Sequence, residues 1–214
     1  MTHPSDTLIA SLVGELQPVK PLSFARGLTY ALAAAAISAL AVVAAFGMRA
    51  DLMAGQFDPI FLIATGLFLV LGIAAAVTVI VMSRPQVGNE HGGWVWAAAM
   101  VALLPVAAVI VSLGGGNAML SQDSVAHGLE CLMVGGGSSL LVFAILVGWL
   151  RKGAPTAPDH AGLVSGVAAG SLGIFAFSLH CADNDIVHIG LWHSGVVLLM
   201  AGIGRTLVPR LVRW

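Results

Sequence analysis

Two cysteines and the histidines near them are the residues of this sequence best suited to chemistry. The chain has two cysteines, Cys131 and Cys181. His127 precedes Cys131 by four positions, so the two side chains share one face if the segment is helical. Three more histidines lie next to or shortly after Cys181: His180, His188 and His193. Cysteine and histidine are preferred ligands of zinc and other soft or borderline metals, and two neighbouring thiols can form a disulfide.

Three interpretations of this group stay open on the residues alone: a structural disulfide, a redox switch, and a metal site that draws on both cysteines and the four histidines. A disulfide requires the two Cα atoms to lie within about 7 Å. We expect Cys131 to open its helix, where the helix dipole favours the thiolate. No resident cofactor is expected, apart from transient zinc or heavy-metal binding at the cysteines.

Composition places these residues in a membrane protein. Of 214 residues, 58% are hydrophobic and 9% charged, whereas a soluble domain carries about 25% charged residues. Six apolar windows approach the roughly 20 residues that span a bilayer: 27–48, 59–82, 93–113, 130–150, 161–180 and 189–208. They are continuously apolar and lack the alternation of barrel strands. The sequence therefore predicts an all-α, polytopic bundle of six transmembrane helices surrounded by lipid.

The basic residues predict the orientation of this bundle. Eight of the nine lie at one end of the predicted helices, and Arg49 is the exception. Lys and Arg are retained on the cytoplasmic side, so we expect a bacterial inner-membrane protein with N and C termini in the cytoplasm and both cysteines at the periplasmic face. The periplasm is oxidising and allows disulfides to persist. The cations form no basic patch, so no direct nucleic-acid binding is expected.

The N-terminal segment predicts a short amphipathic helix. Five apolar residues form one stripe at helical spacing: Leu8, Ile9, Leu12, Val13 and Leu16. A helix of about ten residues is marginal alone in water and needs a surface to cover the stripe. The polar face carries no cation before Lys20, so a groove on a soluble protein fits better than a membrane surface; membrane packing and disorder are the alternatives. We therefore divide the chain into a cytoplasmic binding segment, 1–26, and a transmembrane domain, 27–214.

A run of glycines in the fifth predicted helix favours close helix packing. Gly162, Gly166 and Gly170 recur every fourth position, and Gly173 follows. Small residues at this spacing let helix backbones approach closely. The partner is either another helix of the same bundle, which is the preferred interpretation, or a second copy of the chain in a homodimer.

Three ordered motifs resemble the NrsF-type anti-sigma-F factors, which are membrane-bound negative regulators of extracytoplasmic-function sigma factors. They are LIASLVGELQPVKPL at 8–22, GLECL at 128–132, and LHCADNDIVHIGLWH at 179–193 before the basic VPRLVRW end. The resemblance covers essentially the whole chain. It implies a regulator without enzymatic activity, whose partner is a sigma factor of the sigma-F type. It also implies that Cys131 and Cys181 sense oxidative or heavy-metal stress, and that the N-terminal stripe binds the sigma factor, with Pro18 and Lys20 in the adjoining motif.

Two other functions compete with this interpretation. A membrane thiol oxidoreductase would need a reactive Cys-x-x-Cys and a second pair, and the chain has neither. A small transporter with a structural periplasmic disulfide would need ionisable residues near the middle of the membrane or broken helices. Pro105 is a helix breaker within a predicted span, but no charge lies near the middle of one.

Overall fold

The computed structural model describes residues 4–15, 21–85, 92–114 and 122–212. Within these ranges the chain is helical, without strands, and six helices are long and apolar enough to cross a membrane. The first five are α2 (Phe24–Phe46), α4 (Pro59–Met82), α5 (Gly93–Leu113), α6 (Gln122–Lys152) and α7 (Pro158–Ser178). The sixth span consists of three consecutive helical pieces: α8 (Ile186–His188), the π-helical turn η2 (Ile189–His193) and α9 (Ser194–Leu211). The predicted all-α fold with six spans is confirmed.

Helix α7 lies at the centre of the bundle. It packs against α4, α6, α9 and α2, and 89% of its most apolar window is buried. Three of its glycines, Gly162, Gly166 and Gly170, face α9 and allow backbone contact, whereas Gly173 faces α6. A Cβ on Gly162 would collide with the carbonyl oxygen of Gly204, and one on Gly166 with that of Met200. The glycine stripe is thus used for packing within the bundle, as preferred from the sequence.

The helix that carries Cys131 begins earlier than predicted. Helix α6 begins at Gln122, whereas the apolar window begins at residue 130, because the polar residues that precede the window continue the helix beyond its apolar part. Cys131 therefore lies inside α6 and does not open it. The expectation that a helix terminus favours its thiolate is wrong, since the dipole acts mainly within the first turn.

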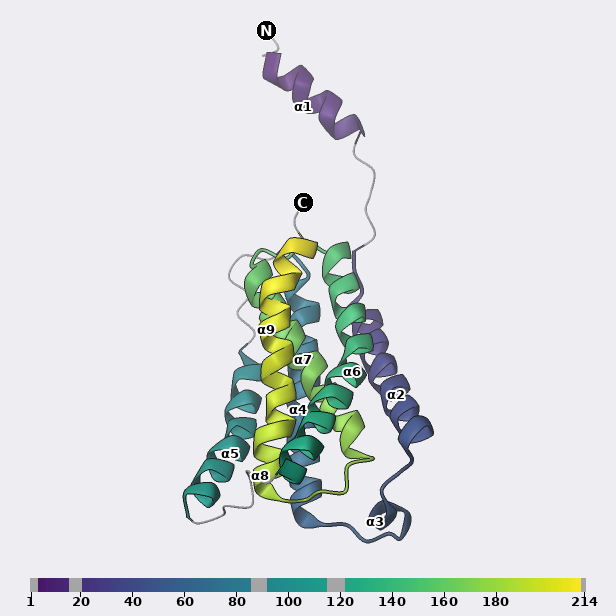
Figure 1. Cartoon of the computed structure of the whole chain (residues 1–214). Coiled ribbons are helices and arrows are strands. Elements are labelled where there is room, and N and C mark those ends of the chain that lie inside the picture. The colour runs from purple at the N-terminus through teal and green to yellow at the C-terminus, as the bar shows by residue number, and fades with distance from the viewer. Residues whose placement is uncertain (1–3, 16–20, 86–91, 115–121, 213–214) are drawn as a thin grey trace.

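The N-terminal helix is also present, as α1 (Pro4–Glu15). Four residues of its stripe are exposed by between 57% and 61%: Leu8, Ile9, Leu12 and Val13. Leu16, Pro18 and Lys20 lie outside the described residues. Figure 1 shows α1 beyond the end of the bundle where α2 begins and α9 ends. Nothing in the described part of the chain covers this apolar stripe.

The opposite end of the bundle carries the connections around the cysteines. Figure 1 shows the short helix α3 (Ala50–Met53) and α8 at this end, far from α1. Cys181 lies in the connection between α7 and α8, and Cys131 lies in the third turn of α6. We call this the thiol end of the bundle.

Candidate functional site

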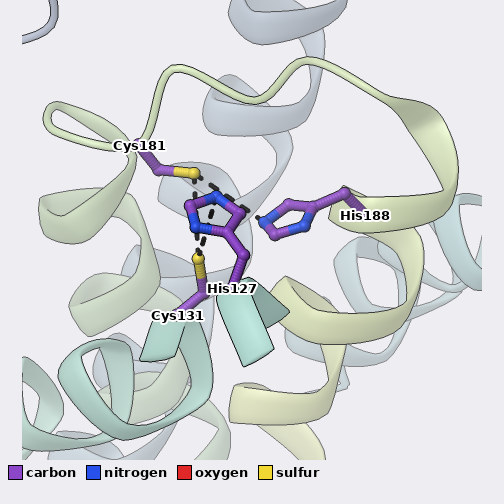
Figure 2. A group of neighbouring side chains, drawn as sticks. All are labelled: His127, Cys131, Cys181 and His188. Atoms are coloured by element: carbon purple, nitrogen blue, oxygen red, sulfur yellow. Dashed lines mark hydrogen bonds between the residues drawn. The ribbon is translucent and has the colours of Figure 1, made fainter. Parts of the chain in front are cut away.

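Four side chains converge at the thiol end, and we call them the thiol centre: His127, Cys131, Cys181 and His188 (Figure 2). The sulfur of Cys131 lies 3.9 Å from the sulfur of Cys181 and 3.9 Å from Nε2 of His127. The sulfur of Cys181 lies 3.8 Å from Nε2 of His188. All four potential ligand atoms lie within 4.8 Å of one another. Both thiols are free and buried.

The start of α6 and the π-helical turn must approach closely to form this centre. His127 and Cys131 share one face of α6, and Gly128 between them lies directly against the indole of Trp192. A Cβ at position 128 would collide with that indole, so only glycine permits this packing. The approach brings the rings of His127 and His188 into a stack with centroids 5.1 Å apart.

Two aspartates orient His188. Asp185 caps α8 by accepting hydrogen bonds from the backbone N–H groups of Val187 and His188. An oxygen of Asp183 lies 3.3 Å from Nδ1 of His188. In the neutral imidazole this partner holds the proton on Nδ1, so the lone pair of Nε2 is directed at the sulfur of Cys181.

Two of the six predicted metal ligands lie outside the four-residue group. His180 is turned away from the sulfurs: its Nδ1 lies 3.1 Å from the carbonyl oxygen of Gly47, and its ring packs on Phe46. Neighbouring positions 180 and 181 face different ways because α7 ends just before them. His193 is buried behind the centre, with its ring centroid 5.2 Å from that of His188. Its ring packs against that of His188, but none of its atoms belongs to the thiol centre.

The two thiols are electrostatically unequal. The pKa of the Cys181 thiol is lowered, chiefly because the Cys131 thiol donates a hydrogen bond to its sulfur. The imidazoles of His188 and His193 lower it further, while burial opposes the shift. Cys181 is therefore the sulfur that ionises first, and a thiolate is the form that reacts with oxidants and metals.

Arg49 is a part of the site that sequence analysis did not assign. Its guanidinium is buried and donates two hydrogen bonds to Asp51, at 2.7 and 2.6 Å, one to the carbonyl oxygen of Cys181 at 2.8 Å, and one to Asn184 at 2.9 Å. It also lies over the ring of Phe61, 4.2 Å from the centroid. The signal in the sequence was its position as the one cation at the predicted periplasmic side.

The hydrogen bonds from Arg49 also change the acidity of Asp51. They lower the pKa of Asp51 below its ordinary value of 3.8. The backbone N–H of Arg49 donates to the carbonyl oxygen of Leu179 at 3.0 Å. Arg49 thus ties the connection after α2 to the backbone on both sides of His180.

Fold and site together define a polytopic helical membrane protein with a buried thiol and histidine centre at the end opposite its N-terminal helix. The chain belongs to the NrsF family, described as negative regulator of sigma F, whose sequence profile matches residues 12–214. This confirms the resemblance drawn from the three sequence motifs.

Two relatives support this assignment. The chain is 27% identical to the "Probable anti-sigma-F factor NrsF" of Azospira oryzae, over 98% of this chain and 99% of the relative. It is 29% identical to the "Anti-sigma-F factor NrsF" of Caulobacter vibrioides, over 78% of each chain. No solved structure matches the chain.

Proposed function

We propose that this chain is an inner-membrane anti-sigma factor that holds an extracytoplasmic-function sigma factor of the sigma-F type. The binding segment is 1–26, and the transmembrane domain 27–214 controls it. Membership of a family described as negative regulator of sigma F supports the partner class. The exposed apolar stripe of α1 is the observation that carries the binding site, because a short helix presenting four large apolar side chains to solvent needs a groove to cover them.

In this proposal α1 and the C terminus lie in the cytoplasm, where sigma factors act, and the thiol centre faces the periplasm. The support is the distribution of the cations, with Arg49 as the one cation at the thiol end among the residues that the structure describes. Alkaline phosphatase is active only in the periplasm. A fusion at the C terminus is expected to be inactive, and one inserted after Gln56, in the exposed connection between α3 and α4, to be active. The reverse pattern would contradict the orientation.

The thiol centre provides the trigger in this proposal. In an oxidative step, Cys131 and Cys181 lose two electrons and two protons to hydrogen peroxide, which is reduced to water, and a disulfide forms. Their sulfurs must then close from 3.9 Å to about 2.05 Å, which moves α6 relative to the connection after α7. The chain has two cysteines, so it lacks the second pair that a thiol oxidoreductase uses to pass electrons on.

The binding role of α1 is tested by placing one carboxylate inside or outside its apolar stripe. Leu12→Asp puts a charge among the apolar side chains and is expected to reduce the amount of sigma factor that co-purifies at least about tenfold, because a charge is costly to bury in a groove. Ser11→Asp adds the same charge at the adjacent position outside the stripe and is expected to co-purify normally. Equal co-purification by both variants would contradict the assignment.

A further inference from the structure

We propose that the thiol centre is a binding site for one d¹⁰ metal cation, Zn²⁺ or Cd²⁺, held by His127, Cys131, Cys181 and His188. The regulatory meaning of this site rests on the proposed function, but metal binding itself does not. The four residues come from α6, from the connection after α7 and from α8. A single ion would therefore link three separate segments of the chain.

The distances fit tetrahedral coordination. With metal–sulfur bonds of about 2.3 Å and metal–nitrogen bonds of about 2.0–2.1 Å, two sulfurs of a tetrahedral zinc site lie about 3.8 Å apart and a sulfur and a nitrogen about 3.6 Å apart. The observed separations are 3.9 Å between the sulfurs, and 3.9 and 3.8 Å between each sulfur and its imidazole nitrogen. These three separations exceed the tetrahedral values by about 0.3 Å or less, and all four ligand atoms lie within 4.8 Å of one another. Closing the two sulfurs to a disulfide requires a much larger movement.

The surroundings of His188 match a metal ligand. Asp183 holds Nδ1 and leaves Nε2 directed into the centre, which is the carboxylate–histidine arrangement that orients imidazole ligands at zinc sites. Burial also fits, because two thiolates balance the charge of a divalent cation and the two thiols release their protons on binding. Three of the four residues are buried, while His127 is exposed, so the ion reaches the sulfurs past His127.

The test titrates the purified full chain with Cd²⁺ alone. It follows the ultraviolet thiolate-to-cadmium absorption and the bound metal after dialysis. Wild type is expected to bind one Cd²⁺ per chain through two thiolates. His127→Ala removes an exposed ligand, and Asp183→Asn leaves all ligands but removes the orienting carboxylate; each is expected to weaken affinity about 10- to 100-fold. His180→Ala is the matched control, because His180 adjoins Cys181 in sequence but faces away, and it is expected to bind as wild type does.

Two results would overturn the metal site. One is wild-type affinity in both His127→Ala and Asp183→Asn, which would leave only a thiol pair. The other is the absence of stoichiometric binding to wild type. Neither result depends on a sigma factor, so the metal site can fail while oxidation of the thiols still releases the partner. Conversely, metal can bind as described while Leu12→Asp shows that α1 is not the binding segment.

A second, independent observation concerns transmission along the bundle. We infer that Arg49 couples the thiol centre to α2, the helix that follows the N-terminal segment. The guanidinium binds the carbonyl oxygen of the sensing residue Cys181 itself, together with Asn184, while the backbone N–H of Arg49 binds Leu179. A buried guanidinium that loses its partners strongly destabilises the fold, because its charge is left without compensation. The Cys181 backbone and the end of α2 must therefore move together, and α2 carries that displacement to the opposite end of the bundle.

Hydrogen exchange of the first turns of α2, residues 24–30, measures this coupling without a sigma factor. In wild type, Cd²⁺ is expected to change the exchange rate of these amides. Arg49→Lys keeps the charge but loses the fork that reaches several acceptors at once, so Cd²⁺ is expected to bind with wild-type affinity and leave exchange in α2 unchanged. Asn184→Ala removes one acceptor of Arg49 and leaves the guanidinium paired with Asp51, so no buried charge loses its partner. This variant is expected to reduce the change that Cd²⁺ causes in the exchange of α2.

Two outcomes would overturn the role of Arg49. An undiminished response of α2 in both variants would show that the displacement travels by another route. A parallel loss of cadmium affinity in Arg49→Lys would show that Arg49 only positions the thiol centre.

Discussion

Cys181 belongs to two networks at once. Its sulfur lies in the thiol centre, and its carbonyl oxygen accepts a hydrogen bond from Arg49. Any chemistry that displaces the sulfur therefore acts on a backbone that is tied to α2. Cys131, by contrast, lies within the regular turns of α6. The two thiols are thus expected to differ in role. Cys181 passes a displacement of its sulfur to α2, whereas Cys131 stays in place within α6.

The ion pair that holds Arg49 predicts a specific pH dependence. Because the pKa of Asp51 is lowered in the folded state, the pair stabilises the fold at pH above the unfolded-state pKa and loses this contribution as pH falls through the folded-state pKa. Replacing Asp51→Asn should lower the thermal unfolding midpoint by the same amount from about pH 7 to about pH 5, with the difference shrinking only below about pH 4. If the difference in unfolding midpoint has already vanished at about pH 5, the proposed role of Asp51 is contradicted.

Part of the thiol centre could be predicted from the sequence. The helical spacing of His127 and Cys131 was sufficient to place them together, and the structure brings the sulfurs of Cys131 and Cys181 to 3.9 Å from each other. His180 lies outside the thiol centre because the chain leaves α7 just before it, and its ring contacts Gly47 and Phe46. Asp183 lies two positions after Cys181 in the sequence, but its contact with His188 depends on the path of the 179–185 connection, which has no periodicity from which to predict it.

Helices α7 and α9 make the closest contact among the membrane spans. Gly166 faces the carbonyl oxygen of Met200, so even a methyl group there must separate the two backbones. Gly166→Ala is expected to destabilise the bundle by about 1–3 kcal/mol. Gly202→Ala, on an exposed face of α9 with no atom near its Cβ position, should stabilise the helix by up to about 1 kcal/mol. Thermal unfolding in detergent, followed by circular dichroism, compares the two; equal midpoints would contradict the packing.

The spans were predictable because the bilayer requires long apolar segments, and each of the six windows corresponds to a helix. Their ends were less predictable. Residues 122–129 continue α6 although polar side chains interrupt the apolar sequence there, and the π-helical turn at Ile189–His193 lies inside an apolar stretch that looks regular in sequence. Hydropathy identifies the segments that are long and apolar enough to cross the hydrocarbon core. Local hydrogen bonding and packing decide where a helix starts and where it widens into a π-helical turn.

At the scale of the whole molecule, the bundle separates a buried thiol centre from an exposed apolar helix at its opposite end. In the mechanism we propose, the two sites act on one conformational equilibrium of the bundle. A ligand at the thiol centre shifts that equilibrium only if it binds the releasing arrangement more tightly than the holding one, and a tenfold change in partner affinity requires about 1.4 kcal/mol of such preference. Coordination that draws α6, α8 and the connection after α7 together provides a structural source for this preference.

The most direct test measures sigma-factor affinity with the chain in lipid nanodiscs, where both faces are accessible, with and without one equivalent of Cd²⁺. The account predicts that Cd²⁺ weakens binding to wild type at least about tenfold and leaves binding to Cys181→Ser unchanged. Equal affinities for wild type in the two conditions, or an equal loss in Cys181→Ser, would contradict the claim that the thiol centre controls the partner held by α1.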